Sequence, residues 1–391
     1  MKLVEIQEAL KKEGLDGWLF FDHHRRDPLA YRVLNFEPQS PVTRRWYYYI
    51  PAKGEPCGLV HKIEAETLNA LPGQHTKYAS WQEMSAGLRA LVRGARTVAM
   101  QYSPKCAIPY VAMVDGGTID LVRGMNIEVV SSADLLQYFD SRWSAEQLEM
   151  HLEASRKVDA TRRAAFQHVG DALRAGRSVT EWDVQQFIRA GFAEQGLVTD
   201  HGPDVAVNAN ASNPHYEPKK DACSEIRKGD VLLMDMWAKI DRPNAVYYDI
   251  TWVGYCGAQP PADVENVFGV VRDARDRAVA FVKDGVHSGR IIQGYQVDDA
   301  ARSIITNAGF GEYFFHRTGH SIGNDVHGTG ANMDNLETHD VREIIPQTCF
   351  SVEPGIYLPK FGIRLEVNVY VGEGDARVTG EVQDKIILLS C

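Results

Sequence analysis

Four carboxylates stand inside apolar, strand-forming segments of this chain, and they constrain its fold more than any other feature. Asp235 lies in VLLMDMW, Asp249 in VYYDITWV, Glu353 in TCFSVEPGIY and Glu366 in GIRLEVNVYV. An isolated buried carboxylate is costly, so each of these side chains needs a cationic partner. Arg364 is the only basic residue in the four segments. Bound metal cations are another way to make several close carboxylates tolerable.

The order of the four acids favours two β-hairpins. The turn sequence DRPN separates Asp235 from Asp249, and LPKFG separates Glu353 from Glu366. Taken alone, each pair also fits acids that flank a surface turn. Taken together, two facing hairpins would bring four carboxylates to one place, which favours a metal centre.

A histidine-rich segment adds a nitrogen donor. HRTGHSIGNDVH covers residues 316–327, and His320 stands between Gly319 and Ser321, which predicts a flexible loop. One imidazole and four carboxylates suit two divalent cations, and oxygen-rich ligation favours Mn²⁺, Co²⁺ or Zn²⁺ over a thiolate-bound metal. Two ions roughly 3.5–4 Å apart lower the pKa of a shared water. Any one of these histidines, taken alone, also fits a structural role.

Composition excludes several classes of protein. The 391 residues are 44% hydrophobic and 24% charged, which excludes wholesale disorder and permits a large core. A net charge of −10 disfavours a nucleic-acid or anionic-membrane binder. The six cysteines form no CxxC motif, no apolar run reaches the ~18 residues of a membrane span, and the N-terminus shows no signal-peptide core. We therefore expect reduced thiols and a cytoplasmic location.

The pattern along the chain predicts two domains that meet near Asp140. Residues 1–140 alternate helical and strand patterns, typical of an α/β domain, with a helix over 3–12 and strands over 17–21, 45–50, 97–100 and 127–130. A long helix is expected within 141–177, because Ser144 and Gln147 form a capping box. Strands are expected over 231–237, 246–253, 348–357 and 362–371, with helices over 178–196, 262–284 and 296–308.

The strand and histidine segments resemble the M24 metallopeptidases, the pita-bread enzymes. The resemblance rests on VLLMDMW, YYDITW, HRTGHSIGNDVH, SVEPGIY and GIRLEVNV in this order, with NPHY at 213–216 before them. It covers about 144–391, and the layout of 1–140 is similar to the creatinase-type N-terminal domain of the prolidase and aminopeptidase P branch. The resemblance implies an α+β protein, with an α/β N-terminal domain (1–140) and a pita-bread catalytic domain (141–391).

The resemblance also implies a role for each matching ligand. Asp235 would chelate one ion, Asp249 and Glu366 would bridge both ions, and His320 and Glu353 would complete the second site. The two ions would be Mn, Zn or Co. Glu353 would also accept a proton from the bridging water, as the catalytic base.

Three further residues match positions that contact substrate in the family. His215 and His327 match two histidines that bind the substrate and help to stabilise the tetrahedral state. Arg364 matches an arginine that pairs with the substrate's free carboxylate. A guanidinium there equally suits a buried partner for a ligand carboxylate, and both interpretations stay open.

The chain departs from the family pattern near these residues. Trp252 stands where many relatives have an arginine, Val246 where many have a tyrosine, and Gly328 where many have an acid. None of these positions is an expected metal ligand, so two-metal hydrolysis is still expected. Tyr247 or Tyr248 offers a substitute, but strand alternation sends the two rings to opposite faces.

The activity implied by the resemblance is hydrolysis of the peptide bond before proline in a small peptide. That bond lacks an N–H, and the proline ring fixes its local shape. The chain length favours an Xaa-Pro dipeptidase, with an aminopeptidase P acting on longer peptides as the alternative. A non-catalytic pita-bread binding protein and a metal-free amidinohydrolase are further alternatives, which bound metal would exclude. A homodimer is expected, without nucleic-acid or membrane partners.

Overall fold

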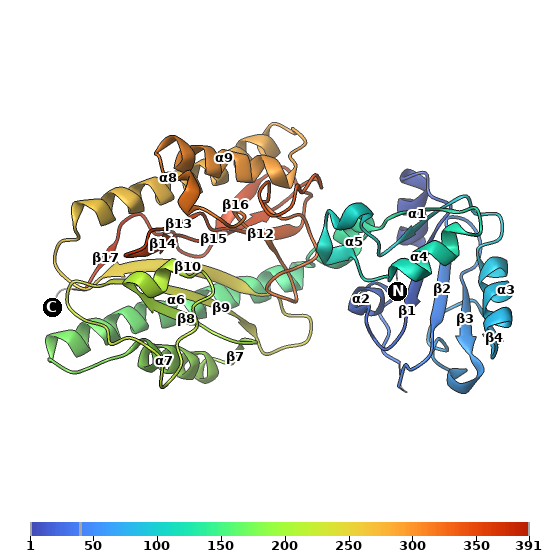
Figure 1. Cartoon of the computed structure of the whole chain (residues 1–391), viewed down its shortest axis with the longest axis horizontal. Coiled ribbons are helices and arrows are strands. Elements are labelled where there is room, and N and C mark those ends of the chain that lie inside the picture. Colours follow the sequence, from blue (N-terminus) through green and yellow to red (C-terminus); the bar gives the residue numbers. More distant parts are fainter. Residues whose placement is uncertain (1, 39–40, 390–391) are drawn as a thin grey trace. The chain divides into compact units, whose positions relative to one another are not determined.

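The computed structural model describes residues 2–38 and 41–389 (Figure 1). The chain divides into two compact units, Met1–Asp140 and Ser141–Cys391, called unit 1 and unit 2 below. Among the described residues, no helix is both long enough and apolar enough to cross a membrane.

Unit 1 contains a six-stranded sheet in the order β4-β3-β2-β1-β5-β6. Strand β2 runs antiparallel to β1 and β3, and the other neighbours pair in parallel. The strands are β1 Gly17–Asp22, β2 Trp46–Pro51, β3 Cys57–His61, β4 Gln74–Tyr78, β5 Thr97–Met100 and β6 Glu128–Ser131. The helices are α1 Leu3–Lys12, α2 Pro28–Leu34, α3 Trp81–Leu91, α4 Gly116–Arg123 and α5 Ala133–Leu136.

Strand β1 shows why helices cover both faces of this sheet. Its six residues are all buried, as expected for a strand covered on both sides. Trp18 and Phe20 pack in one hydrophobic cluster with residues of α1 and α2, whereas Leu19 and Phe21 pack in another with residues of α3 and α4. Alternating side chains of one strand therefore supply both cores of unit 1.

The described residues of unit 2 form three sheets. The first has the order β17-β10-β9-β7, with β8 also paired to β9; the second has the order β11-β12-β15-β16; the third is β13-β14. The strands are β7 Leu197–Val198, β8 Asp204–Val207, β9 Val231–Ile240, β10 Tyr248–Tyr255, β11 Ser321–Ile322, β12 Thr348–Val352, β13 Gly355–Tyr357, β14 Gly362–Arg364, β15 Val367–Val371, β16 Ala376–Thr379 and β17 Ile387–Leu388. The helices are α6 Ala145–Arg174, α7 Glu181–Glu194, α8 Ala262–His287 and α9 Gly294–Asn307.

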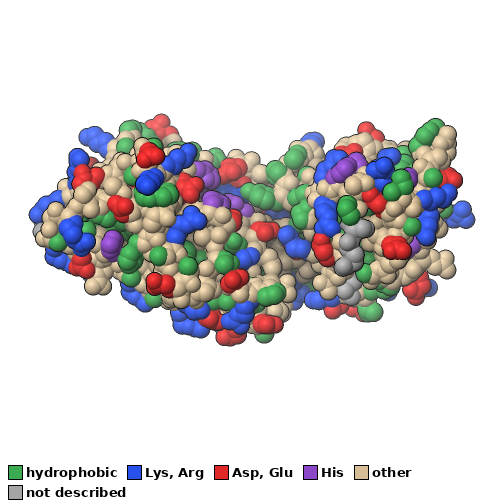
Figure 2. Space-filling model, turned by 90° about the horizontal axis from the view of Figure 1, so that it is seen from below, with side chains coloured by type: hydrophobic (Ala, Val, Ile, Leu, Met, Phe, Trp, Pro, Cys, Tyr) green, Lys and Arg blue, Asp and Glu red, His purple; other side chains and the backbone are tan. Residues whose placement is uncertain are grey.

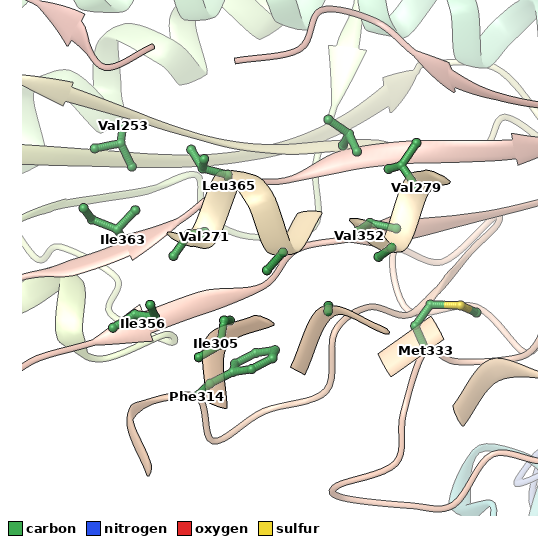
Figure 3. Packing of buried hydrophobic residues seen from close by; sticks show 14 of the residues in the cluster. Val253, Val271, Val279, Ile305, Phe314, Met333, Val352, Ile356, Ile363 and Leu365 are labelled. Atoms are coloured by element: carbon green, nitrogen blue, oxygen red, sulfur yellow. The ribbon is translucent and has the colours of Figure 1, made fainter. Parts of the chain in front are cut away.

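In Figure 1, α8 and α9 lie above the sheets of unit 2 and α7 lies below them, while α6 packs along β9 and β10. One hydrophobic cluster joins the upper helices to the strands, and Figure 3 shows part of it. Val271 and Val279 of α8 belong to this cluster together with Val352 of β12 and Leu365. The strands that carry the expected ligands thus pack against an apolar layer formed with these helices.

The structure confirms the helix over 3–12 and the capping box at Ser144 and Gln147, which starts α6. The continuous strands expected over 348–357 and 362–371 are wrong. Each is interrupted, at Glu353 and at Glu366, so that β12 pairs with β15 and β13 pairs with β14. At each break the glutamate N–H leaves the ladder, because that of Glu353 donates to the Thr318 carbonyl and that of Glu366 donates to the Thr251 carbonyl.

Candidate metal centre and active site

The hairpin of β9 and β10 positions the two aspartates. The strands are antiparallel, and Asp235 lies opposite Thr251. Residues directly opposite each other, and residues two apart on one strand, share a face of the sheet. Asp235 and Asp249 therefore project from the same face as diagonal neighbours, with Asp249 buried and Asp235 half-buried.

The two glutamates lie where the second pair of strands is interrupted. A hydroxyl fixes each carboxylate: Thr251 Oγ1 donates to Glu366 Oε2 (2.9 Å), and Ser351 Oγ donates to Glu353 Oε1 (3.0 Å). Leaving the ladder frees each side chain from strict strand alternation. Both can therefore turn toward the aspartates of the neighbouring hairpin.

His320 reaches the same place from a loop anchored on α9. Asp298 of that helix accepts hydrogen bonds from the N–H (2.9 Å) and hydroxyl (2.6 Å) of Thr318, two residues before the histidine. The imidazole Nε2 lies 3.3 Å from Glu353 Oε1 and 3.6 Å from Asp249 Oδ2. The loop is therefore held in place, rather than flexible as the sequence suggests.

The donor atoms suit a divalent cation. Asp249, His320 and Glu366 each offer one ligand atom, and these atoms lie within 4.8 Å of one another. Asp235 Oδ1, Asp249 Oδ1 and Glu366 Oε1 are buried without a hydrogen-bond partner in the described part of the chain. Buried oxygens in this state need a cation or a proton, so the residues present fit the metal that the sequence implies.

The electrostatics of the cluster also favour a bound cation. Burial raises the pKa values of Asp249 and Glu366 well above their usual range, and repulsion from the neighbouring carboxylates raises them further. Burial likewise raises the pKa of Glu353 to about 7, although Arg364 opposes the shift. Burial lowers the pKa of His320 well below its usual value. Neutral imidazole is the form that binds metals, and a cation would favour the ionised carboxylates.

Arg364 has protein partners on every side of its guanidinium. Its Nε donates to Thr251 Oγ1 (3.0 Å) and its Nη1 to Tyr357 OH (3.2 Å), while its Nη2 pairs with Asp235 Oδ2. The side chain is buried. These contacts favour a role as the partner of a ligand carboxylate, one of the two interpretations that the sequence leaves open.

The two remaining histidines lie on the solvent side of the cluster. His327 is exposed, and its ring meets that of His320 edge to face with centroids 4.3 Å apart. His215 is also exposed and lies near enough to influence the charge on His327. Figure 2 shows several histidine side chains at the surface of unit 2. Surrounding protein atoms nevertheless lower the pKa of His327 to about 4, with help from nearby Arg317.

Sequence reasoning missed several residues that support the cluster. Thr251 and Ser351 stand two residues from Asp249 and Glu353, so strand alternation offered a signal for both. Asp204 of β8 lies opposite Asp235, and burial raises its pKa to about 8. No local pattern marks Asp204, because its position depends on pairing with a distant strand.

Residues at and next to the departures from the family pattern pack in the interior of unit 2. Tyr247 and Tyr248 pack in two different hydrophobic clusters, as strand alternation predicts. Val246 packs with Tyr247, so it fills space in the core. The guanidinium of Arg162, from α6, lies 3.3 Å from the centre of the Trp252 ring.

Comparisons with known proteins agree with this fold. A probable dipeptidase PepE of Mycobacterium tuberculosis is 27% identical over 347 residues, covering 87% of this chain and 84% of that protein. An Xaa-Pro dipeptidase of Lactobacillus delbrueckii subsp. lactis is 32% identical over 226 residues, covering 56% of this chain and 55% of the relative.

Solved structures show the same architecture. Dipeptidase PepE from Mycobacterium ulcerans superimposes with a TM-score of 0.72 at 22% identity, covering 100% of this chain and 97% of that one. The prolidase from Pyrococcus horikoshii OT3 gives 0.66 at 20% identity, covering 99% and 100%. At such identities the likeness shows the fold alone. Residues 149–373 match the model of metallopeptidase family M24, and the chain therefore belongs to this family of pita-bread hydrolases.

Proposed function

We propose that this protein is a dinuclear Xaa-Pro dipeptidase, which cleaves the peptide bond before a C-terminal proline. The observation that carries the proposal is the set of buried carboxylate oxygens without hydrogen-bond partners around His320. Relatives named Xaa-Pro dipeptidase support the choice of substrate. The ligands proposed are Asp235, Asp249, His320, Glu353 and Glu366.

Two divalent ions held there would supply a water of lowered pKa and positive charge opposite the developing oxyanion. Glu353 accepts the proton of the attacking water and passes it to the proline nitrogen. The Ser351 hydroxyl and the imidazole of His320 keep the carboxylate oriented.

His215 and His327 act on the substrate in this proposal. Both are accessible, in contrast to the buried ligand His320. They would donate hydrogen bonds to the scissile carbonyl and to the proline side of the substrate. Arg364 orients Asp235 and, through Thr251, Glu366.

The test is a matched pair of substrates, Ala-Pro and Ala-Pro-Ala, with Ala-Ala as control. Protein stripped with a chelator should be inactive, and Mn²⁺, Zn²⁺ or Co²⁺ should restore activity up to two ions per chain, measured by elemental analysis. Preference for Ala-Pro supports the dipeptidase, and preference for Ala-Pro-Ala would support an aminopeptidase P. Absence of proline-specific cleavage in the fully loaded protein would refute both.

A further inference from the structure

An unpaired carboxylate stands beside the proposed metal ligands. Asp204 of β8 is directly opposite Asp235 of β9 in an antiparallel ladder. Side chains of directly opposed residues project from the same face of a sheet. Asp204 therefore faces the side of the sheet that carries Asp235 and Asp249, although it is not needed for the proposed five-ligand set.

The carboxylate of Asp204 differs from those of Asp235, Glu353 and Glu366 in its contacts. Asp235 pairs with Arg364, Glu353 accepts from Ser351 and Glu366 accepts from Thr251. Asp204 is half-buried, yet its side chain makes neither a hydrogen bond nor an ion pair with any described residue. A partly desolvated acid without such contacts is an unfavourable arrangement unless a ligand supplies the partner.

A second acid strengthens the negative field at this place. Glu217, two residues after His215, acts electrostatically on Asp204. Gln185 of α7 links the two segments, because its Nε2 donates to the Pro203 carbonyl (3.0 Å) and approaches Glu217 Oε1 at 3.5 Å. Arg364, whose charge acts on Asp204, already donates to Asp235, Thr251 and Tyr357. Among the described residues, neither acid forms an ion pair with a cation.

We propose that Asp204, supported by Glu217, binds a positively charged group on the residue that precedes the scissile bond. This group is either the free α-ammonium of the dipeptide or a basic side chain of that residue. The inference rests on the proposed function and adds a substrate class to it. The charge-assisted contact orients the N-terminal residue beside Asp235, so Asp204 is a substrate-binding residue and makes no covalent step.

Three substrates separate the two sources of charge: Leu-Pro, Lys-Pro and 2-hydroxyisocaproyl-Pro, in which a hydroxyl replaces the ammonium of Leu-Pro. The Asp204→Asn variant keeps the shape and removes the negative charge. If the α-ammonium is bound, KM for Leu-Pro and Lys-Pro should rise roughly 10- to 100-fold with kcat little changed. KM for the hydroxy analogue, which lacks the ammonium, should then change little. If a basic side chain is bound, only Lys-Pro should lose affinity.

Matched controls keep the outcomes distinct. Glu217→Gln should give the same pattern with a smaller change, and Glu225→Gln, an exposed acid that pairs with Arg227, should change nothing. Metal content is measured for each variant. The inference is overturned if Asp204→Asn leaves KM unchanged for all three substrates or weakens the binding of all three equally. It is also overturned if the variant loses metal. Failure of the wild-type protein to cleave any Xaa-Pro substrate would instead refute the proposed function.

Discussion

The two hairpins that carry the proposed ligands are built differently. Strands β9 and β10 pair without interruption from Ala238 opposite Tyr248 to Val231 opposite Tyr255. The partner strands are split into β12–β15 and β13–β14, with a glutamate at each split. The regular hairpin thus carries the two aspartates, whose side chains are short, at paired positions of a continuous ladder. The interrupted strands carry the two glutamates, whose side chains are longer, at positions where the backbone hydrogen bonds between the strands are broken.

The interrupted strands are held in place by the regular ones. Asn368 of β15 accepts from the N–H of Asp249 (3.0 Å) and donates to its carbonyl (2.6 Å). The N–H of Glu366 donates to the Thr251 carbonyl at 3.1 Å. The regular hairpin therefore sets the geometry, and the interrupted strands are fixed against it. Substitutions in β10 should therefore disturb the ligands on both hairpins.

The largest effect is expected for Asp249→Ala in the regular hairpin. This change removes a buried ligand that faces both His320 and Glu366. We expect at least one ion to be lost and hydrolysis of Ala-Pro to fall by roughly 1,000-fold or more. Elemental analysis and kinetics check this, with the exposed Asp241→Ala as control. Wild-type turnover in Asp249→Ala would remove Asp249 from the ligand set.

Glu353→Gln tests whether the glutamate at the first break of the interrupted strands acts as the catalytic base. The amide keeps the shape and the contact with Ser351 but cannot take a proton near neutral pH. We expect kcat to fall roughly 100- to 1,000-fold, while KM changes by less than about threefold. Unchanged kcat at full metal loading would exclude Glu353 as the base.

Thr251→Val tests the link between the hairpins. The hydroxyl donates to Glu366 and accepts from Arg364, and valine has the same shape without it. Removing a group that orients a ligand costs roughly 10- to 100-fold in metal affinity. Competition with a chelator measures that affinity, and Thr306→Val, an exposed position of α9, serves as a control away from the ligands. Equal affinity in the wild type and Thr251→Val would mean that the interrupted strands hold Glu366 without help from β10.

The remaining effect concerns the stability of the fold and not the reaction. His151 of α6 is fully buried between the Tyr247 carbonyl (2.7 Å) and the Thr379 hydroxyl (2.7 Å), and so it joins the two sheets. Burial lowers its pKa to about 4 from the usual 6.5. Its neutral form therefore stabilises the fold fully above pH 6.5, and this contribution is lost as pH falls toward 4, up to roughly 3 kcal/mol.

Urea unfolding between pH 7.5 and 5 measures this contribution. Wild type should lose more free energy of unfolding over this range than His151→Gln, whose side chain does not titrate. Identical pH profiles for the two proteins would contradict the assignment. Both are compared with the same metal loading, because acid also competes with metal for the ligands.

How much the sequence could predict depends on the range of the interactions involved. Asp235, Asp249, Glu353 and Glu366 were visible because charges inside apolar strands are unusual, and the α6 capping box is a local signal. The breaks at Glu353 and Glu366 were not visible, because the carbonyls that replace the ladder belong to Thr318 and Thr251, far away along the chain. The same reason hides Asp204, whose partner strand follows only after a long loop.

Trp252 stands where many members of the family have an arginine, and its surroundings show what a position-by-position comparison of sequences leaves out. An alignment would score this site as an arginine lost, since the family pattern has one there. In three dimensions a guanidinium is present, supplied by Arg162 from a helix almost a hundred positions upstream and held against the indole by Glu381 and Asp159. A comparison by aligned position alone would therefore miss the guanidinium that the fold places beside Trp252.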